Sequence, residues 1–205
     1  MTLRFCVLGD SIAFGQGATR PEDTIGRRLS RALVEAGHPN ALNVVAQPRA
    51  RSDALAGQVR LAIEWRADLA LVIIGANDLT HFVPVPRAAT QLGNAVRQLR
   101  RGGVEVIVVP APDMSVVPWV PPQMREVVSG ISAELRRAQT RIATDEGAGV
   151  VDLHIEGPGA DFAGDLDLFS ADRFHPSSKG YANIAAALVP AAIAAAAGIA
   201  ARRPT

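Results

Sequence analysis

The chain has 205 residues, of which 48% are hydrophobic and 20% charged, and this composition excludes a disordered or fibrous protein. Its 21 basic and 20 acidic residues are interspersed and leave a net charge of +1, so the charge pattern does not favour a nucleic-acid partner. We therefore expect a single soluble globular domain over residues 1–205 with one sizeable core.

The single cysteine, Cys6, has no partner for an intrachain disulfide, and no cysteine pair is present to bind zinc. The segment Leu3 to Leu8 leads directly into Gly9-Asp10-Ser11, without the charged start and the small-residue cleavage site of a signal peptide. We therefore expect a cytoplasmic protein. The apolar tract at 184–201 is mostly Ala and contains Pro190, which favours a C-terminal helix packed on the domain over stable membrane insertion.

Apolar runs of strand length alternate with stretches of helical period along the chain. This alternation is typical of a parallel sheet covered by helices on both faces. The runs are short and rich in Val, Ile and Leu, as buried parallel strands are. We predict five strands, at Leu3 to Leu8, Ala41 to Val45, Leu69 to Ile74, Val104 to Val109 and Val150 to Leu153.

Five helices are predicted between and after these strands. The first begins behind Thr24, a candidate N-cap, and the second follows Ser52 in the same way. The third is opened by Pro86 and closed by Gly102-Gly103, and the last is capped by Ser177. The apolar positions that mark the first four are Ile25, Leu29 and Leu33, then Leu55, Val59 and Ala62, then Leu92, Val96 and Leu99, then Val127, Ile131, Leu135, Ala138 and Ile142.

For five parallel strands joined by right-handed crossovers, the commonest arrangement is the flavodoxin-like order 2-1-3-4-5 in a three-layer α/β/α sandwich. Strands one and three are neighbours in this order. A ligand is expected in the crevice at their carboxyl ends. The chain enters that crevice at Gly9-Asp10-Ser11 and again at Gly75-Ala76-Asn77-Asp78.

Ser11 lies just past the first strand, where the free N–H groups and the dipole of a helix N-terminus stabilise a negative oxygen. That location suits a nucleophile, although a Ser in such a turn is more often only a helix cap. Asp172 and His175 follow the fifth strand and supply a base with a carboxylate that fixes its tautomer. Taken by itself, the pair of Asp172 and His175 is equally compatible with a surface contact.

Asn77 follows the third strand, and its amide can donate to an oxyanion, a contact worth about 3 kcal/mol where such donors have been removed. It is also a common turn residue. The placement of Ser11, Asn77 and the Asp172–His175 segment at the ends of three strands predicts a hydrolase site that uses no metal and no cofactor. Gly15-Gln16-Gly17 fails the dinucleotide fingerprint, and no phosphate-binding loop or zincin motif occurs.

From Phe5 to Ala187, the chain resembles the SGNH hydrolases, also called the GDSL-like esterase and lipase family. The resemblance implies that Ser11 is the nucleophile and an oxyanion donor through its own N–H, and that Asn77 is a second donor. It also implies that Asp172 and His175 are the acid and the base. The matching blocks are Val7-Leu8-Gly9-Asp10-Ser11, Gly75-Ala76-Asn77-Asp78 and Asp172-Arg173-Phe174-His175-Pro176.

One block departs from the family pattern. The family usually places a Gly after the second strand, and the N–H of that Gly completes the oxyanion hole. Here the segment reads Ala46-Gln47-Pro48-Arg49-Ala50-Arg51-Ser52, with Arg49 in the place of the Gly. The resemblance therefore implies that the N–H of Arg49 is the third donor, at a position where a side chain makes a positive φ costly.

Two further histidines, His81 and His154, are candidates for an alternative base or for satisfied polar residues. The segment from Pro110 to Pro122 carries apolar side chains that suit either an acyl pocket or packing over the sheet edge.

The expected function is a serine esterase acting on a small-molecule ester. Three alternatives remain open, because a fold does not name a substrate. The first is an acyl thioesterase or lysophospholipase, whose acyl-length profile would peak beyond about eight carbons. The second is a non-catalytic binding module on the same fold, and the third is a peripheral membrane protein that uses the Ala-rich tail.

Overall fold

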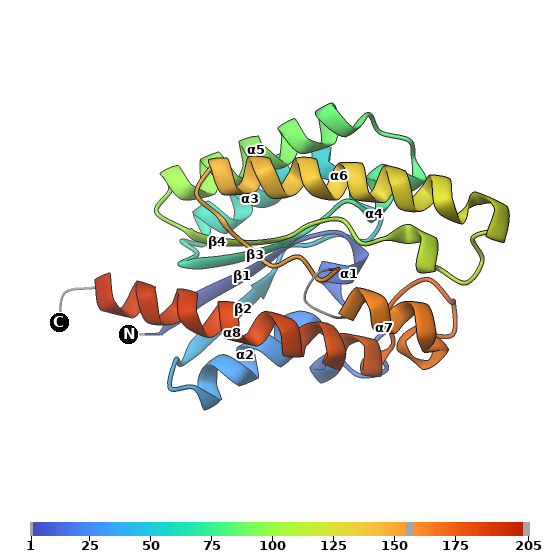
Figure 1. Ribbon diagram of the computed structural model, residues 1–205. Coiled ribbons are helices and arrows are strands. Elements are labelled where there is room, and N and C mark those ends of the chain that lie inside the picture. The colour runs from blue at the N-terminus through green and yellow to red at the C-terminus, as the bar shows by residue number, and fades with distance from the viewer. Residues whose placement is uncertain (1, 155–157, 203–205) are drawn as a thin grey trace.

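The computed structural model describes residues 2–154 and 158–202, and a parallel sheet forms its centre (Figure 1). The sheet has five strands in the order β2-β1-β3-β4-β5, so the predicted order is confirmed. All four ladders are parallel. The strands are β1 (Leu3–Gly9), β2 (Asn40–Val44), β3 (Leu69–Ile73), β4 (Glu105–Val109) and β5 (Gly149–Val150).

The first four strands begin and end within one residue of their predicted bounds, but the prediction for the fifth strand was wrong in length. Only Gly149 and Val150 pair with β4, whereas the prediction ran from Val150 to Leu153. The reason is local, because the Asp152 carboxylate accepts the backbone N–H of His154 at 3.0 Å and turns the chain away from the sheet.

Helices cover both faces of the sheet and confirm the three-layer architecture (Figure 1). On one face lie α2 (Ile25–Glu35) and α8 (Ser178–Arg202). On the other lie α3 (Leu55–Glu64), α5 (Val85–Arg101) and α6 (Arg125–Asp145).

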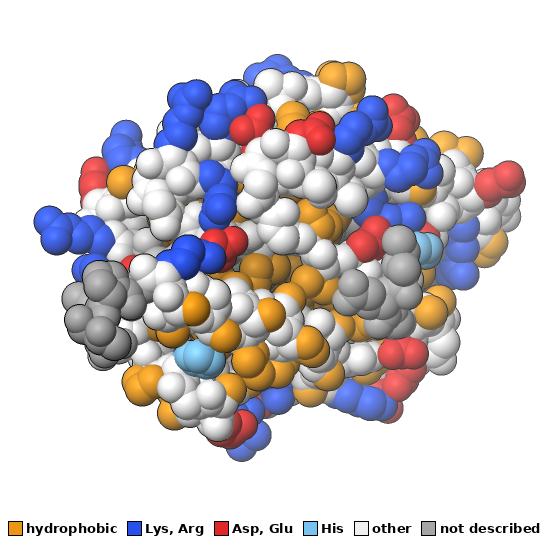
Figure 2. Space-filling view, turned by 60° about the vertical axis from the view of Figure 1, so that its left-hand side comes forward, with side chains coloured by type: hydrophobic (Ala, Val, Ile, Leu, Met, Phe, Trp, Pro, Cys, Tyr) orange, Lys and Arg blue, Asp and Glu red, His pale blue; other side chains and the backbone are white. Residues whose placement is uncertain are grey.

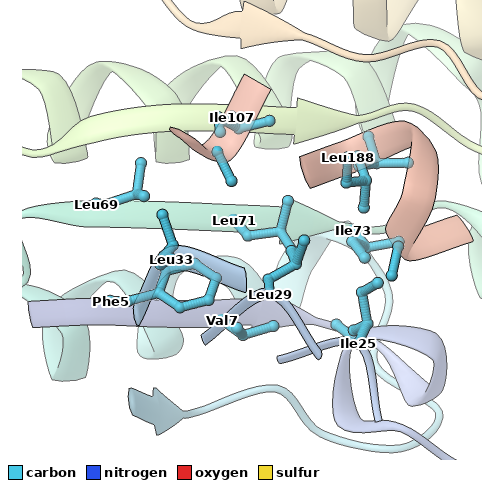
Figure 3. Close-up of a cluster of buried hydrophobic side chains, with 14 of the residues drawn as sticks. Phe5, Val7, Ile25, Leu29, Leu33, Leu69, Leu71, Ile73, Ile107 and Leu188 are labelled. Carbon is cyan, nitrogen blue, oxygen red and sulfur yellow. The ribbon is translucent and has the colours of Figure 1, made fainter. Parts of the chain in front are cut away.

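Alternate strand residues supply the two hydrophobic cores between these layers. Phe5 and Val7 of β1 point toward the α2 and α8 layer, whereas Cys6 and Leu8 point toward the α3 and α5 layer. Figure 3 shows the first core, in which side chains of β1 and β3 meet those of α2 and α8. The core therefore follows the two-residue period of the pleated strand. The labelled members of this core are Phe5, Val7, Ile25, Leu29, Leu33, Leu69, Leu71, Ile73, Ile107 and Leu188.

The Ala-rich tail forms α8, which packs lengthwise beside α2, as expected for a helix that belongs to the domain (Figure 1). Among the described residues, α8 is the one helix long and apolar enough to cross a membrane by length and composition. Hydrophobic side chains gather in the lower half of the face shown in Figure 2. The residues of α8 buried in the domain are Gly180, Tyr181, Ile184, Ala185, Leu188, Ala192, Ala196 and Ile199.

The three predicted caps have different outcomes. The Ser177 hydroxyl accepts the N–H of Gly180 at 3.1 Å, so this cap is confirmed. Thr24 occupies the N-cap position of α2, but its hydroxyl donates to the carbonyl of Pro21 instead. Ser52 does not cap α3, because Ala54 occupies the N-cap position, and the Ser52 hydroxyl donates to the Asp78 carboxylate at 3.0 Å.

The short helical segments, most of which gather near the carboxyl ends of the strands, were not predicted, because a few residues carry no readable helical period. The α-helical ones are α1 (Ser11–Phe14), α4 (Ala76–Thr80) and α7 (Pro158–Gly164). The 3₁₀ segments are η1 (Pro21–Asp23), η2 (Ser52–Ala54), η3 (Met114–Val116), η4 (Pro122–Met124) and η5 (Leu166–Leu168).

Gly9 is the last residue of β1 and requires the absence of a side chain. Its φ is +133°, and an added Cβ would lie 1.8 Å from the carbonyl oxygen of Ile73 on β3.

We predict that Gly9→Ala lowers the free energy of unfolding by at least about 3 kcal/mol, as measured by urea unfolding. The control is Gly57→Ala in α3, where no atom lies within 4 Å of the added Cβ. That variant is expected to be as stable as the wild type or more stable, by up to about 1 kcal/mol. Equal stability of the two variants would contradict this role of Gly9.

Candidate active site

Ser11 begins α1, immediately after the carboxyl end of β1. Asp10 is the N-cap residue, and its carboxylate accepts the N–H of Ile12 at 2.9 Å. The sharp exit from β1 therefore presents the Ser11 hydroxyl at the rim of the sheet, although the residue is only 3% exposed. The predicted position of this residue beside a helix N-terminus is confirmed.

A buried glutamine of α3 holds the strand end that precedes Ser11. The Gln58 side chain accepts the N–H of Gly9 at 2.7 Å and donates to its carbonyl at 2.9 Å. It satisfies the N–H of Gly9 and shares the carbonyl of Gly9 with the backbone N–H of Gln47, which lies 3.0 Å away in the segment after β2. The sequence analysis missed this residue. The available signal was a Gln inside the apolar repeat formed by Leu55, Val59 and Ala62.

A second buried glutamine acts in the same way one strand further along. Gln139 of α6 accepts the N–H of Ala111 at 2.7 Å and donates to the carbonyl of Ile74 at 3.2 Å. It therefore joins the segments that leave β3 and β4. Both glutamines are at most 1% exposed. The sequence analysis missed Gln139 as well.

His175 lies between Asp172 and Ser11. Its Nδ1 is 2.6 Å from a carboxylate oxygen of Asp172, and its Nε2 is 3.0 Å from the Ser11 hydroxyl oxygen. An ionised carboxylate can only accept, so Nδ1 carries the proton and Nε2 of the neutral ring accepts from the hydroxyl. Residues separated by 164 positions are thus joined in one hydrogen-bonded line.

The Asp172 carboxylate is fixed by several donors. Desolvation by itself would raise its pKa, but hydrogen bonds from the His175 ring and from the N–H groups of His175 and Phe174 outweigh it, together with the Ser170 hydroxyl. The pKa of Asp172 therefore lies well below its usual range. The carboxylate stays ionised under ordinary conditions.

A glycine allows the loop after α1 to lie against His175. Gly17 has a φ of +94°, and an added Cβ would lie 2.5 Å from the carbonyl oxygen of Pro176 and 2.9 Å from the His175 Cβ. The Tyr181 hydroxyl donates to the carbonyl of the preceding Gln16 at 2.8 Å. The fully buried Tyr181 of α8 thus anchors this loop beside the imidazole.

Asn77 lies in α4, after β3, and faces the segment that follows β2. One hydrogen of its side-chain amide is donated to the carbonyl of Ala50 at 3.0 Å. The neighbouring Asp78 accepts both the N–H and the hydroxyl of Ser52. These contacts tie the exits of β2 and β3 together beside Ser11.

Arg49 adopts a φ of +66° in the turn that follows β2. Ala50 closes this turn by donating its N–H to the carbonyl of Gln47 at 3.1 Å. Within the part of the chain that the structure describes, the backbone N–H groups of Arg49 and Ser11 have no acceptor. These two groups and the second amide hydrogen of Asn77 are donors available at one pocket, whose lining is Ser11, Gln16, Arg49, Asn77, His81, Phe174 and His175.

The family model for the GDSL-like lipase/acylhydrolase family matches residues 7–182. The chain belongs to that family. The resemblance derived from the three motif blocks is therefore confirmed. The GDSL-like esterase Rv1075c of Mycobacterium tuberculosis is 34% identical over 180 residues, which are 86% of this chain and 57% of that protein. The chain thus spans little more than half the length of this relative.

Solved structures share the fold of this chain. TesA superposes with a TM-score of 0.73 at 19% identity, covering 91% of this chain and 96% of TesA. The psychrotrophic esterase EstA from Pseudoalteromonas sp. superposes with a TM-score of 0.68 at 19% identity, covering 97% of both chains. At such identities the likeness shows the α/β/α fold.

The two other candidate histidines, His81 and His154, occupy different places. His81 lines the pocket at Ser11, where its Nδ1 lies 2.9 Å from the carbonyl oxygen of Asn77. His154 lies instead along a separate apolar cavity, and its backbone N–H donates to Asp152. Among the described residues, His175 is the histidine hydrogen-bonded to Ser11. In residues 2–154 and 158–202, no group of three or more His, Cys, Asp or Glu side chains is arranged to hold a metal ion.

An apolar cavity of about 100 Å³ lies beside the pocket at Ser11. Phe174 lines both spaces, and its ring stacks on the exposed Trp119 with centroids 5.5 Å apart. Ile12 and Pro176, the direct neighbours of Ser11 and His175, also line the cavity. The segment after β4 contributes Pro110, Ala111, Pro112, Asp113, Met114, Val116 and Val117.

Two buried carboxyls, those of Asp10 and Asp78, lie near the turn that carries Ser11. Burial raises the pKa of Asp10 to about 7 although the N–H of Ile12 donates to it, and the nearby Asp78 carboxylate adds to the rise. Burial also raises the pKa of Asp78, against the hydrogen bonds from Ser52. The helical turn that carries Ser11 is therefore capped by Asp10, a carboxyl whose ionisation costs free energy.

Because the pKa of Asp10 rises from 3.8 to about 7 on folding, the folded protein binds this proton more tightly than the unfolded chain. The contribution of Asp10 to stability therefore decreases as the pH rises from about 4 to about 7. We predict that the free energy of unfolding of Asp10→Asn, relative to wild type, increases over this interval by about 4 kcal/mol at most.

Urea unfolding at a series of pH values measures this difference. Asp145→Asn, at the exposed carboxyl end of α6, is the control and is expected to give a smaller change with pH. A difference between Asp10→Asn and wild type that is independent of pH would contradict the prediction.

Proposed function

We propose that this protein hydrolyses carboxylic esters through an acyl-enzyme formed on Ser11. The observation that carries the proposal is the hydrogen-bonded line from Asp172 through His175 to Ser11, with distances of 2.6 and 3.0 Å. Membership of the GDSL-like lipase/acylhydrolase family supports the same reaction class. We therefore assign the serine esterase reaction expected from the sequence to Ser11, His175 and Asp172.

In the first step, the Ser11 hydroxyl oxygen attacks the ester carbonyl carbon while Nε2 of His175 removes the hydroxyl proton. Asp172 stays ionised and stabilises the imidazolium that forms, because its depressed pKa keeps it from taking the proton. The carbonyl oxygen becomes an oxyanion. His175 then gives the proton to the alcohol oxygen as the tetrahedral intermediate collapses.

The oxyanion would accept hydrogen bonds from the N–H of Ser11, the N–H of Arg49 and the amide of Asn77. The support for this set is that each group lines the catalytic pocket and retains a donor without an acceptor among the described residues. Each such donor is worth about 3 to 4 kcal/mol of transition-state stabilisation in a site of this kind. The positive φ of Arg49 is compatible with a donor role for its N–H.

In the second half of the reaction, a water molecule replaces the alcohol. His175 removes a proton from this water, and the resulting hydroxide attacks the acyl carbon on Ser11. The second tetrahedral intermediate releases the carboxylic acid, and the proton returns to the Ser11 oxygen. The protein is then in its starting state.

We predict that Ser11→Ala lowers kcat for 4-nitrophenyl butyrate by at least about 10³-fold, because no other group can form the acyl-enzyme. The release of nitrophenolate measures the rate. Ser30→Ala on α2, where the hydroxyl only hydrogen-bonds Asn40, is the matched control and should retain the wild-type rate. A fluorophosphonate should label wild type and not Ser11→Ala. Equal rates in wild type and Ser11→Ala would contradict the assignment of Ser11 as the nucleophile, and an unlabelled wild type would favour the non-catalytic binding module.

The apolar cavity beside Phe174 favours substrates with an apolar acyl chain. Ile12 and Pro176 adjoin the nucleophile and the base in the chain, so an acyl group on Ser11 has apolar surface close by. Each buried methylene contributes about 0.8 kcal/mol. This observation supports the alternative of an acyl thioesterase or lysophospholipase that uses the same residues on longer chains.

A series of 4-nitrophenyl esters tests the role of the cavity. We predict that kcat/KM rises from acetate to butyrate by up to about fourfold per methylene. Val116→Trp fills the cavity and should lower kcat/KM for the longer esters more than for acetate. Val127→Trp, on the exposed side of α6, is the matched control. A maximum beyond about eight carbons would favour the thioesterase or lysophospholipase. An unchanged profile in Val116→Trp would exclude the cavity as the acyl site.

A further inference from the structure

Arg49 occupies a backbone position that disfavours a long side chain. It is the third residue of the turn from Gln47 to Ala50 and has a φ of +66°, a conformation that Gly or Asn normally supplies. A side chain in this region costs about 1 to 2 kcal/mol. Strain of this kind clusters at active sites, and the exposed Arg49 lines the pocket at Ser11.

The Arg49 guanidinium has no ion-pair or hydrogen-bond partner within residues 2–154 and 158–202. The neighbouring Arg51 differs, because it pairs with Asp53 at 3.2 Å. No Asp or Glu is among the described residues that line the catalytic pocket. An unpaired cation therefore lies at the pocket of Ser11, with no carboxylate lining it to compete for that cation.

The positive charge continues beyond the catalytic pocket. A second hollow shares His81 with it and is lined by Arg51, Arg87, Asp53 and Asp78, among others. Asp53 is already paired with Arg51, and Asp78 is held by Ser52. Arg87 has no side-chain partner in the described part of the chain. The two adjoining hollows therefore each contain one Arg without a side-chain partner among the described residues, Arg49 in one and Arg87 in the other, whereas the charge of Arg51 is balanced by Asp53.

The other side of the active site has a different character. Phe174 separates the catalytic pocket from the apolar cavity, and no Arg or Lys lines that cavity. An ester on Ser11 thus meets an apolar space on one side and an unpaired cation on the other. The two parts of the substrate are expected to match these two environments.

We propose that Arg49 binds an anionic group on the alcohol part of the substrate, so that the preferred esters carry a carboxylate or a phosphate there. A guanidinium presents a fork of N–H donors that matches both groups. This assignment of a specificity residue rests on the proposed reaction at Ser11. The acyl part then occupies the apolar cavity.

Three butyrate esters that differ only in the alcohol test the proposal. The alcohols are 3-hydroxypropanoate, 2-hydroxyethyl phosphate and the neutral 2-methoxyethanol, and titration of the released butyric acid gives kcat/KM. Wild type should prefer at least one of the anionic esters over the neutral ester by about tenfold or more, and added salt should reduce the preference. The anion with the larger ratio identifies the chemical class.

For each variant, the ratio of kcat/KM for the anionic ester to kcat/KM for the neutral ester separates the contribution of the Arg49 guanidinium from that of the Arg49 backbone. Arg49→Gln should bring the ratio to about one, and Arg49→Lys should retain part of it. Arg49→Gly relieves the positive φ, so it should lose the ratio without a lower unfolding temperature. Arg101→Gln removes the same charge at the carboxyl end of α5 and should keep the wild-type ratio.

A wild-type ratio of one or less, or a ratio retained in Arg49→Gln, would overturn the assignment to Arg49. Neither result would affect the reaction proposed for Ser11. That reaction fails separately if Ser11→Ala hydrolyses the neutral butyrate at the wild-type rate. The neutral ester therefore reports on the catalytic proposal, and the ratio reports on Arg49.

Discussion

The close approach of β1 to β3 at Gly9 is the constraint on which the catalytic geometry depends. The space that a Cβ would need at Gly9 is occupied by the carbonyl of Ile73, so the two strands meet without a side chain between them. This contact fixes where the chain leaves β1, and hence where Ser11 starts its helical turn. The imidazole of His175 reaches the hydroxyl across 3.0 Å only because that exit is fixed.

Buried polar side chains continue the sheet beyond the ends of its strands. Gln58 and Gln139 satisfy backbone groups of the segments that leave β1, β3 and β4, and Asp78 ties the exit of β3 to that of β2. Parallel strands diverge at this edge, and unpaired backbone groups there would cost about 1 to 3 kcal/mol each. The helices therefore do more than cover the sheet. Their polar side chains supply hydrogen bonds to the backbone groups that line the crevice, and these groups would otherwise lack partners.

The order of the sheet and the bounds of four strands were predictable from the sequence because buried parallel strands are continuous apolar runs. The fifth strand was predicted too long, since an Asx turn at Asp152 ends it after Val150. The prediction that Ser52 caps α3 was also wrong. Ser52 begins a 3₁₀ segment two residues before the N-cap of α3, and its hydroxyl donates to the distant Asp78 carboxylate, a partner about which a local pattern contains no information.

The sequence by itself determined the family, the candidate site residues and the strand that each of them follows, because motifs and apolar periods are local properties of the chain. The tertiary structure decided which of these groups touch. It joined Ser11 to His175 across 164 positions, excluded His154 from that contact, and left the Arg49 guanidinium without a partner at the pocket. Distances of this kind depend on strand register and on packing between layers, which arise only when segments far apart in the chain bury their apolar faces together.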